Sequence, residues 1–161
     1  EMRSTGEVMG WDDDFGMAFL KSQMGVGVQL PDSGTVFVSL RDGDKKAIVP
    51  AIRKLIDFGF SVLATSGTAA FLEGEGLKVT RINKVLEGQP HIVDAMINGN
   101  VQLVFNTTEG AASLADSASI RRTAVNRKIP YFTTLASSMA SVQAIESMKD
   151  REISVRALQS A

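Results

Sequence analysis

The sequence TVFVSLRDGDKKAIVPAIRKLIDFGFSVLATSGT occupies residues 35–68. It begins and ends with short apolar runs, Thr35–Leu40 and Ser61–Thr65, which have the length and composition of buried β-strands. The residues between them predict a helix over Lys45–Asp57, followed by Gly59 as a helix stop. Its apolar side chains recur at helical spacing, as Ile48, Ala51, Ile52, Leu55 and Ile56. A strand, a helix and a strand in this order predict parallel strands joined by a crossover helix.

The same alternation continues to the end of the chain. Further strands are expected at Lys78–Ile82, Gln102–Asn106 and Tyr131–Thr134. Further helices are expected at Thr68–Glu73, Pro90–Asn98, Ser117–Asn126 and Ser137–Met148. The pattern predicts an α/β fold, a three-layer Rossmann-like parallel sheet of about five strands flanked by helices.

Pro50 conflicts with an uninterrupted helix over Lys45–Asp57. Beyond the first turn of a helix, proline removes a backbone donor and crowds the carbonyl one turn earlier. We therefore expect that helix to begin later than Lys45 or to bend at Pro50.

The first 34 residues differ from the rest, because glycine and other turn-forming residues dominate both ends of this segment. Between those ends, Asp13 is placed to cap a short helix with one apolar stripe, formed by Phe15, Ala18, Phe19 and Ser22. That stripe packs either on its own domain, which we favour, or on a neighbouring domain. We expect residues 1–34 to form a linker and short helix and residues 35–161 to form the main domain. Glu1 in place of an initiator Met suggests excision from a longer polypeptide.

Composition excludes several classes of function. The chain has 161 residues, 17 Lys and Arg against 18 Asp and Glu, no cysteine and a single histidine. It lacks the basic excess of a nucleic-acid or anionic-membrane binder, and no apolar run is long enough to cross a bilayer. Without cysteine there is no thiol chemistry, and one histidine leaves little basis for a metal site. A cytoplasmic protein without its own metal is the expectation.

Polar residues follow the predicted strands, and in an open parallel sheet such loops meet at one edge. Thr65, Ser66, Gly67 and Thr68 open a helix, so their hydroxyls, backbone N–H groups and the helix dipole can hold an anion. An ordinary helix cap and turn is the alternative for this loop. Lys45 and Lys84 would add positive charge, although each alone could be a solvated surface lysine. Together these residues favour a phosphate site.

Other polar residues near these strand ends have weaker signals. Asn106, Thr107 and Thr108 end a strand and suit hydrogen bonding to a ligand, with capping and a turn as the alternative. Asp42 and Asp44 are expected to cap the following helix and face lysines rather than to bind a metal. His91 is expected to be structural, because no carboxylate is evidently placed to orient it.

Taken in order, these motifs resemble the C-terminal allosteric domain of the carbamoyl-phosphate synthase large subunit of bacterial type. The matching stretches are SLRDGDK at 39–45, ATSGT at 64–68, NKVLEGQPHI at 83–92, FNTT at 105–108 and IRR at 120–122. RSTGEVMG at 3–10 resembles the family segment that leads out of the preceding ATP-grasp synthetase unit. The resemblance covers essentially the whole chain.

The resemblance implies a methylglyoxal-synthase-like fold and a regulatory, non-catalytic role, with UMP as inhibitor and IMP or ornithine as activator. It implies that the effector contacts are Lys45, Thr65, Gly67, Thr68, Lys84, Asn106 and Thr108. It places Tyr131 and Thr133 in the ornithine site, completed by acidic residues of the synthetase domain. No catalytic or metal-binding residue is implied.

The implied partners are the synthetase domains of the same subunit, the glutaminase small subunit and a second copy of this domain. The parent enzyme uses ATP with Mg or Mn to make carbamoyl phosphate for pyrimidine and arginine biosynthesis. This chain departs from many bacterial relatives at Gly110, Ala111 and Ala112, where those relatives carry Gly-Arg-Arg. The two missing cations leave the affinity for UMP open, whereas Asn83-Lys84 favours nucleotide response over response to N-acetylglutamate.

Two enzymes with related folds are alternatives. Methylglyoxal synthase uses a carboxylate base in a Gly-Asp-Gln motif, but the matching stretch here reads Gly88-Gln89-Pro90-His91. Loss of a general base lowers the rate by roughly 10² to 10⁴. IMP cyclohydrolase needs a Lys-x-Leu-His-Pro-type segment, which this sequence lacks. The sequence therefore favours regulation over catalysis.

Overall fold

We analysed a computed structural model, which describes residues 13–83, 91–107 and 111–160. Side chains are described within residues 18–83, 91–107 and 117–152. Five parallel strands form one sheet in the order β3-β2-β1-β4-β5. The strands are β1 Thr35–Ser39, β2 Ser61–Ala64, β3 Thr80–Arg81, β4 Leu103–Asn106 and β5 Tyr131–Phe132. The predicted five-stranded α/β fold is confirmed, although the strands are shorter than expected.

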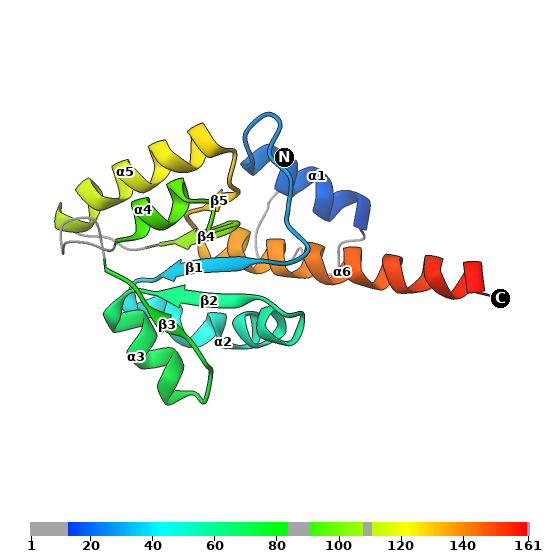
Figure 1. The fold of residues 1–161 in the computed structure, drawn as a ribbon, viewed down its shortest axis with the longest axis horizontal. Helices are drawn as coiled ribbons and strands as arrows, with labels where there is room; N and C mark the ends of the chain where they lie inside the picture. Colours follow the sequence, from blue (N-terminus) through cyan, green and yellow to red (C-terminus); the bar gives the residue numbers. More distant parts are fainter. Residues whose placement is uncertain (1–12, 84–90, 108–110, 161) are drawn as a thin grey trace.

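Six helices surround this sheet among the described residues (Figure 1). They are α1 Asp13–Gln23, α2 Asp42–Asp57, α3 Ser66–Gly74, α4 Ile92–Ile97, α5 Ala111–Arg127 and α6 Leu135–Ser160. The predicted helices are all present but differ in length, most of all α6, which extends well past Met148. The last turns of α6 project beyond the sheet in Figure 1.

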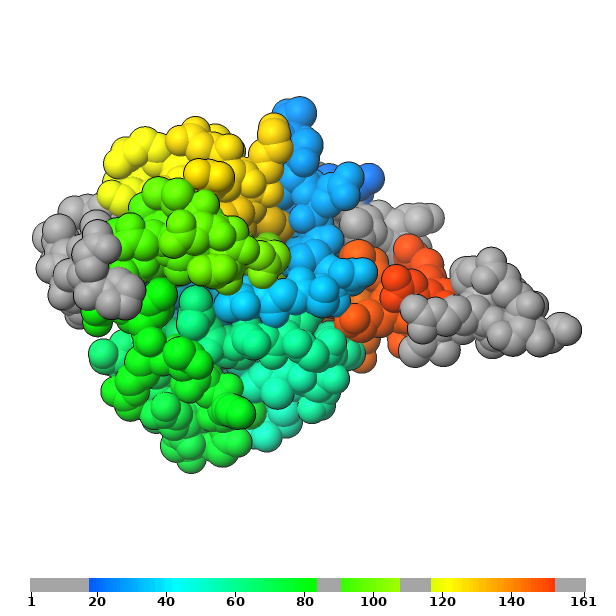
Figure 2. Space-filling view, viewed as in Figure 1, coloured from blue at the N-terminus to red at the C-terminus, as the bar shows by residue number. Residues whose placement is uncertain are grey.

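The two faces of the sheet bury two separate hydrophobic clusters. Val36 and Val38 of β1 pack in the cluster that α1, α2, α3 and α6 cover. Phe37 points the opposite way, into a cluster with residues of α4 and α5. Successive side chains of a strand alternate between its faces, so this central strand contributes to both clusters. Figure 1 shows β1 between the α4 and α5 layer and the α2 and α3 side of the molecule. In the space-filling view of Figure 2, α4 and α5 form the upper part of the surface and α3 forms the lower part.

Helix α2 contradicts one of the two effects expected of Pro50. It begins at Asp42, earlier than predicted, and continues through Pro50 to Asp57, so the expectation of a later start is wrong. Pro50 and Lys46 are both exposed. The Lys46 carbonyl, which loses its intrahelical donor because proline has no N–H, can therefore be hydrated at low cost.

The N-terminal helix packs on its own domain. Leu20 of α1 is 0% exposed and belongs to the cluster of Val36 and Val38. Phe19, Met24 and Leu30 pack against that cluster. The helix therefore packs on its own domain, as favoured, but Ala18 and Ser22 of the expected stripe are exposed and Leu20 is buried instead. The boundary after residue 34 stays a prediction. Within the described residues, no helix has both the length and the apolar character needed to traverse a bilayer.

Candidate functional site

The candidate site lies at the carboxyl edge of the sheet, where β1, β2 and β4 end side by side. Ser39 of β1 shares a 3.1 Å hydrogen bond with Thr65, which follows β2. The next residue, Leu40, donates its backbone N–H to Thr68 Oγ1 at 3.0 Å. Both threonines are buried. The predicted loop around Thr65 is therefore fixed against the end of the central strand.

The start of α3 is not closed by its own cap residue. Thr65 occupies the N-cap position with extended backbone but makes no side-chain capping hydrogen bond. Its hydroxyl instead contacts Ser39 of the neighbouring strand. The ordinary-cap alternative for this loop therefore does not describe Thr65. The first N–H groups of a helix have no intrahelical acceptor and carry the positive end of its dipole, so this end can receive an anion.

Lys45 places its positive charge at this helix start. A Cβ built on Gly67 would lie 3.4 Å from Lys45 Nζ, so the ammonium lies directly over the glycine. The Lys45 side chain is only 13% exposed and donates a 2.7 Å hydrogen bond to Asp42 Oδ1. That hydrogen bond, together with the positive charge, holds the pKa of the Asp42 carboxyl below its ordinary value. The predicted proximity of Lys45 and the Gly67 loop is present in the structure.

The two acids at the start of α2 behave differently from the prediction. Asp42 faces a lysine as expected, but Asp44 is buried and pairs with Arg41 at 3.0 Å. Arg41 is the N-cap residue of α2, and no side-chain hydrogen bond caps this helix. The predicted capping role is therefore wrong, because both carboxylates are held by nearby cations instead.

The loop after β4 is tied to the loop after β1. Thr107 donates its N–H to the Ser39 carbonyl at 2.9 Å, and its Oγ1 accepts the Arg41 N–H at 3.2 Å. Thr107 is buried. It therefore holds the two loops in a fixed relationship.

Asn106 lies on the β5 side of the same edge. Its Nδ2 donates to Ser117 Oγ at 3.0 Å and to Tyr131 OH at 3.3 Å. The Arg121 guanidinium lies 5.2 Å from the centre of the Tyr131 ring. A predicted nucleotide contact, Asn106, and a predicted ornithine contact, Tyr131, are thus hydrogen-bonded to each other.

The predicted residues therefore form two groups. Lys45, Thr65, Gly67 and Thr68 surround the ends of β1 and β2, whereas Asn106 and Tyr131 lie across β4 and β5. Thr133 follows β5 and is exposed. Lys84 and Thr108 lie outside the described residues.

Sequence reasoning missed Ser117 and Arg121 as neighbours of this edge. Ser117 was expected only as the start of a helix and Arg121 only as part of a helix and of the IRR stretch at 120–122. They contact Asn106 of β4 and Tyr131 of β5. The sequence feature that could have identified them is their spacing. A polar and a charged residue four positions apart lie on one face of a helix.

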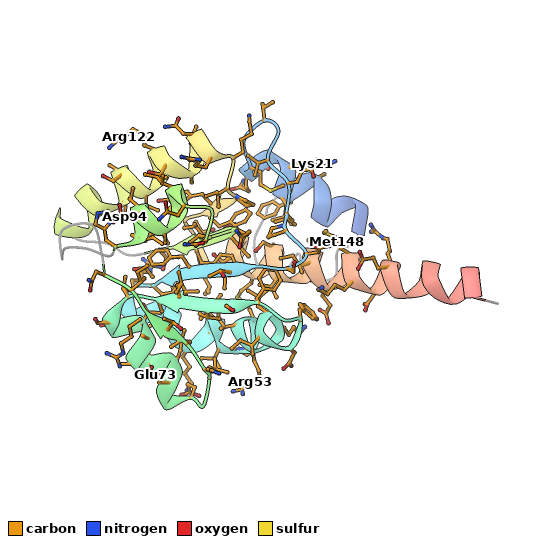
Figure 3. The ribbon with its side chains drawn as sticks, in the orientation of Figure 1. Lys21, Arg53, Glu73, Asp94, Arg122 and Met148 are labelled. Atoms are coloured by element: carbon orange, nitrogen blue, oxygen red, sulfur yellow. The ribbon has the colours of Figure 1, made fainter. Side chains whose placement is uncertain are left out.

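His91 caps α4 and lies near the Asp94 carboxylate without a hydrogen bond to its Oδ2. Its Nδ1 accepts the Asp94 N–H at 3.4 Å, which caps α4, and its Nε2 lies 3.6 Å from Asp94 Oδ2. Asp94 is labelled on α4 in Figure 3. The expected structural role is confirmed by this cap. Asp94 lies three residues later, one helical turn away, but 3.6 Å is too long for a hydrogen bond that would orient the ring.

Two further observations concern metal binding and the position of a cavity. No group of three or more potential metal-ligating His, Cys, Asp or Glu side chains occurs in the described part of the chain. A shallow cavity of about 560 Å³ lies over β2 and beside α4. Thr35 and Ser61, which begin β1 and β2, line it together with Gln102, so it lies toward the opposite ends of these strands.

Comparison with known proteins gives the family. Residues 47–133, more than half of the chain, match the model of the MGS-like domain. The chain belongs to the MGS-like domain family. The resemblance inferred from the motifs is thereby confirmed.

This MGS-like domain is similar to part of a longer protein in several bacteria. Over 99% of its length it is 57% identical to the carbamoyl phosphate synthase large chain of Mesorhizobium japonicum. It is 56% identical to that of Rhizobium meliloti and 50% identical to that of a Nostoc species, again over 99% of its length. The chain spans only 14% of the length of these relatives.

A solved structure supports the fold. The domain resembles methylglyoxal synthase from Elizabethkingia anophelis with a TM-score of 0.55, over 70% of this chain and 79% of the other. The two sequences are 19% identical, so this likeness concerns architecture alone.

Proposed function

We propose that this MGS-like domain is the regulatory domain of a carbamoyl phosphate synthase large chain and binds nucleotide effectors by their phosphate. The observation that carries the proposal is the Lys45 ammonium, which lies over Gly67 at the uncapped start of α3. The similarity to large chains, at up to 57% identity, supplies the protein context.

The residues of this group suit a phosphate chemically. A phosphate monoester carries about −1.5 to −2 charge at neutral pH and three acceptor oxygens. The largely buried Lys45 ammonium and the N–H groups of a helix start supply donors and positive potential. Thr68 Oγ1 accepts the Leu40 N–H, so its own hydrogen is available to donate to an anion.

The second group suits the remainder of a nucleotide. Asn106 is buried and its amide nitrogen donates to both Ser117 and Tyr131, so its orientation beside the proposed ligand is fixed. Lys84 and Thr108 complete the proposed effector contacts. UMP is the proposed inhibitor and IMP an activator. Tyr131 and Thr133 are proposed to contribute to an ornithine site that the synthetase domain completes.

The proposed parent is a glutamine-hydrolysing ligase of the cytoplasm, in which this domain does no chemistry. Its proposed partners are the synthetase domains of its own chain, the glutaminase subunit and a second copy of this domain. ATP with Mg or Mn would act in the synthetase domains. An effector that changes the packing of this domain on its neighbour would change the affinity of the synthetase unit for ATP by a coupling free energy of about 1 to 3 kcal/mol. ATP would change the affinity for the effector by the same factor.

Calorimetric titration with UMP, IMP and inorganic phosphate tests the proposal. Lys45→Ala is expected to weaken binding of all three ligands by about tenfold or more, because it removes a charge-assisted hydrogen bond. Lys46→Ala is the matched control, because Lys46 is exposed and lies about 100° around the same helix. Lack of binding to all three ligands by the wild type, or equal losses in both variants, would contradict the proposed site.

An enzyme assay separates regulation from catalysis. Dihydroxyacetone phosphate added to the pure chain is expected to yield no methylglyoxal, because Gly88-Gln89-Pro90-His91 offers no carboxylate base. Appreciable turnover would reject the regulatory role.

A further inference from the structure

The charges at the start of α2 are paired with one another. Arg41 pairs with Asp44 at 3.0 Å, and Lys45 pairs with Asp42 at 2.7 Å. The two positive and two negative charges of residues 41–45 cancel. This part of the proposed phosphate site therefore has no net charge with which to attract an anion until one carboxylate moves away.

The two carboxylates differ in their freedom to move. The Asp44 side chain is 8% exposed and packed in place, so moving it would break its ion pair with Arg41 and disturb the surrounding packing. The Asp42 side chain is 96% exposed, so it can turn into water with little loss. Lys45 cannot follow it outward without leaving a largely buried position over Gly67. Asp42 is therefore the carboxylate that an incoming anion can replace.

We propose that Asp42 is a displaceable counter-ion of Lys45, which competes with the ligand phosphate and sets the affinity and charge selectivity of the site. This inference rests on the proposed function. In the exchange, one carboxylate leaves the ammonium and one phosphate oxygen takes its place. The incoming ligand must supply more charge than the carboxylate it replaces. The exchange thus favours a dianionic phosphate monoester over a singly charged carboxylate.

The contact with Lys45 keeps Asp42 ionised at neutral pH, so that it competes with phosphate for the ammonium. Their hydrogen bond and opposite charges lower the pKa of Asp42, so its carboxylate is ionised wherever a phosphate monoester carries its second charge. The ligand therefore meets an occupied ammonium rather than a free one.

Asp42→Asn tests the inference by calorimetric titration with inorganic phosphate at neutral pH and low salt. It removes the competing charge while keeping the shape of the side chain, and we expect phosphate to bind about 3- to 10-fold more tightly. Asp57→Asn is the matched control, because Asp57 is exposed and ends the same helix, about 22 Å away along its axis. The control is expected to change phosphate affinity by less than about twofold.

A second measurement uses the wild-type chain and needs no variant to fold. The carboxyl carbon resonance of Asp42 is followed during phosphate titration and is expected to move to the position of an unpaired carboxylate. Phosphate binding by the wild type with equal affinity in Asp42→Asn, or with a stationary Asp42 resonance, overturns the counter-ion role and leaves the proposed function intact. Absence of phosphate, UMP and IMP binding by both the wild type and Asp42→Asn overturns the proposed function and this inference together.

Discussion

Lys45 Nζ lies 3.4 Å from the position that a Cβ on Gly67 would occupy, although the two residues belong to different helices, α2 and α3. The contact exists because parallel strands β1 and β2 deliver both helix starts to the same edge of the sheet. Space for a ligand beside this ammonium depends on residue 67 having no side chain.

Gly67→Ala is expected to separate stability from binding. Gly67 lies within α3, where alanine is favoured over glycine by about 0.5–1 kcal/mol, so the free energy of unfolding should not fall. The added methyl group occupies the space under Lys45, and phosphate should bind at least about tenfold more weakly. Denaturant unfolding and calorimetry measure the two effects.

Gly74→Ala is the control for this substitution. Gly74 ends the same helix, and a Cβ there would meet nothing within 4 Å. It should share the stability effect without any loss of binding. Equal phosphate affinity in Gly67→Ala and Gly74→Ala would count against the helix start as the phosphate position.

Thr68→Val is expected to destabilise the fold, whereas Thr68→Ser is not expected to do so to the same degree. Thr68 Oγ1 accepts the Leu40 N–H in a buried environment, and valine leaves that N–H without its acceptor. The loss should be about 1–3 kcal/mol, measured by urea denaturation. A valine variant as stable as the serine variant would show that water replaces the hydroxyl.

Leu20→Ala is expected to lower the free energy of unfolding by about 2–5 kcal/mol, because it opens a cavity in the main core. Leu20 is 0% exposed, whereas the nearby Val26 is 96% exposed. Val26→Ala should change stability by no more than about 0.5 kcal/mol. Similar small effects of the two substitutions would indicate that α1 is dispensable to the fold.

The ion pair of Asp42 and Lys45 predicts a definite pH dependence. Because the pKa of Asp42 is lowered in the folded protein, its contribution to stability is present above the unfolded pKa and is lost as pH falls through the lower folded pKa. Carboxyl titration by NMR should give a depressed midpoint, which returns toward the ordinary value in Lys45→Met. An unchanged midpoint in that variant would assign the depression to another cause.

The sheet was predictable because the residues that form it carry the pattern themselves. Val36, Phe37 and Val38 alternate between two buried faces, and a strand buried on both sides is largely apolar. The continuation of α2 through Pro50 could also have been predicted from the sequence. The apolar spacing of Ile48, Ala51 and Ile52 turns residue 50 toward solvent.

The hydrogen bonds of the site were less predictable. The proximity of Lys45 to the Gly67 loop follows from the topology, because the carboxyl ends of parallel strands lie at the same edge of the sheet. The hydrogen-bond partner of Thr65 could not be predicted from its sequence neighbours, because Ser39 is 26 residues away. Its hydroxyl competes with the N–H groups of α3 for the Thr65 hydroxyl. The partner of Asp44 was also missed: it pairs with Arg41 rather than with a lysine. Tertiary packing decides that Asp44 is the buried carboxylate, and the sequence does not show this.

The hydrogen bond from the Leu40 N–H to Thr68 makes this amide sensitive to changes in the loop that contains Thr68. This N–H belongs to the residue that follows the central strand, and its protection depends on a threonine at the proposed ligand position. Its rate of deuterium exchange should therefore reveal the state of the loop from inside the protein. An unlabelled ligand could be detected in this way without any probe added to the surface.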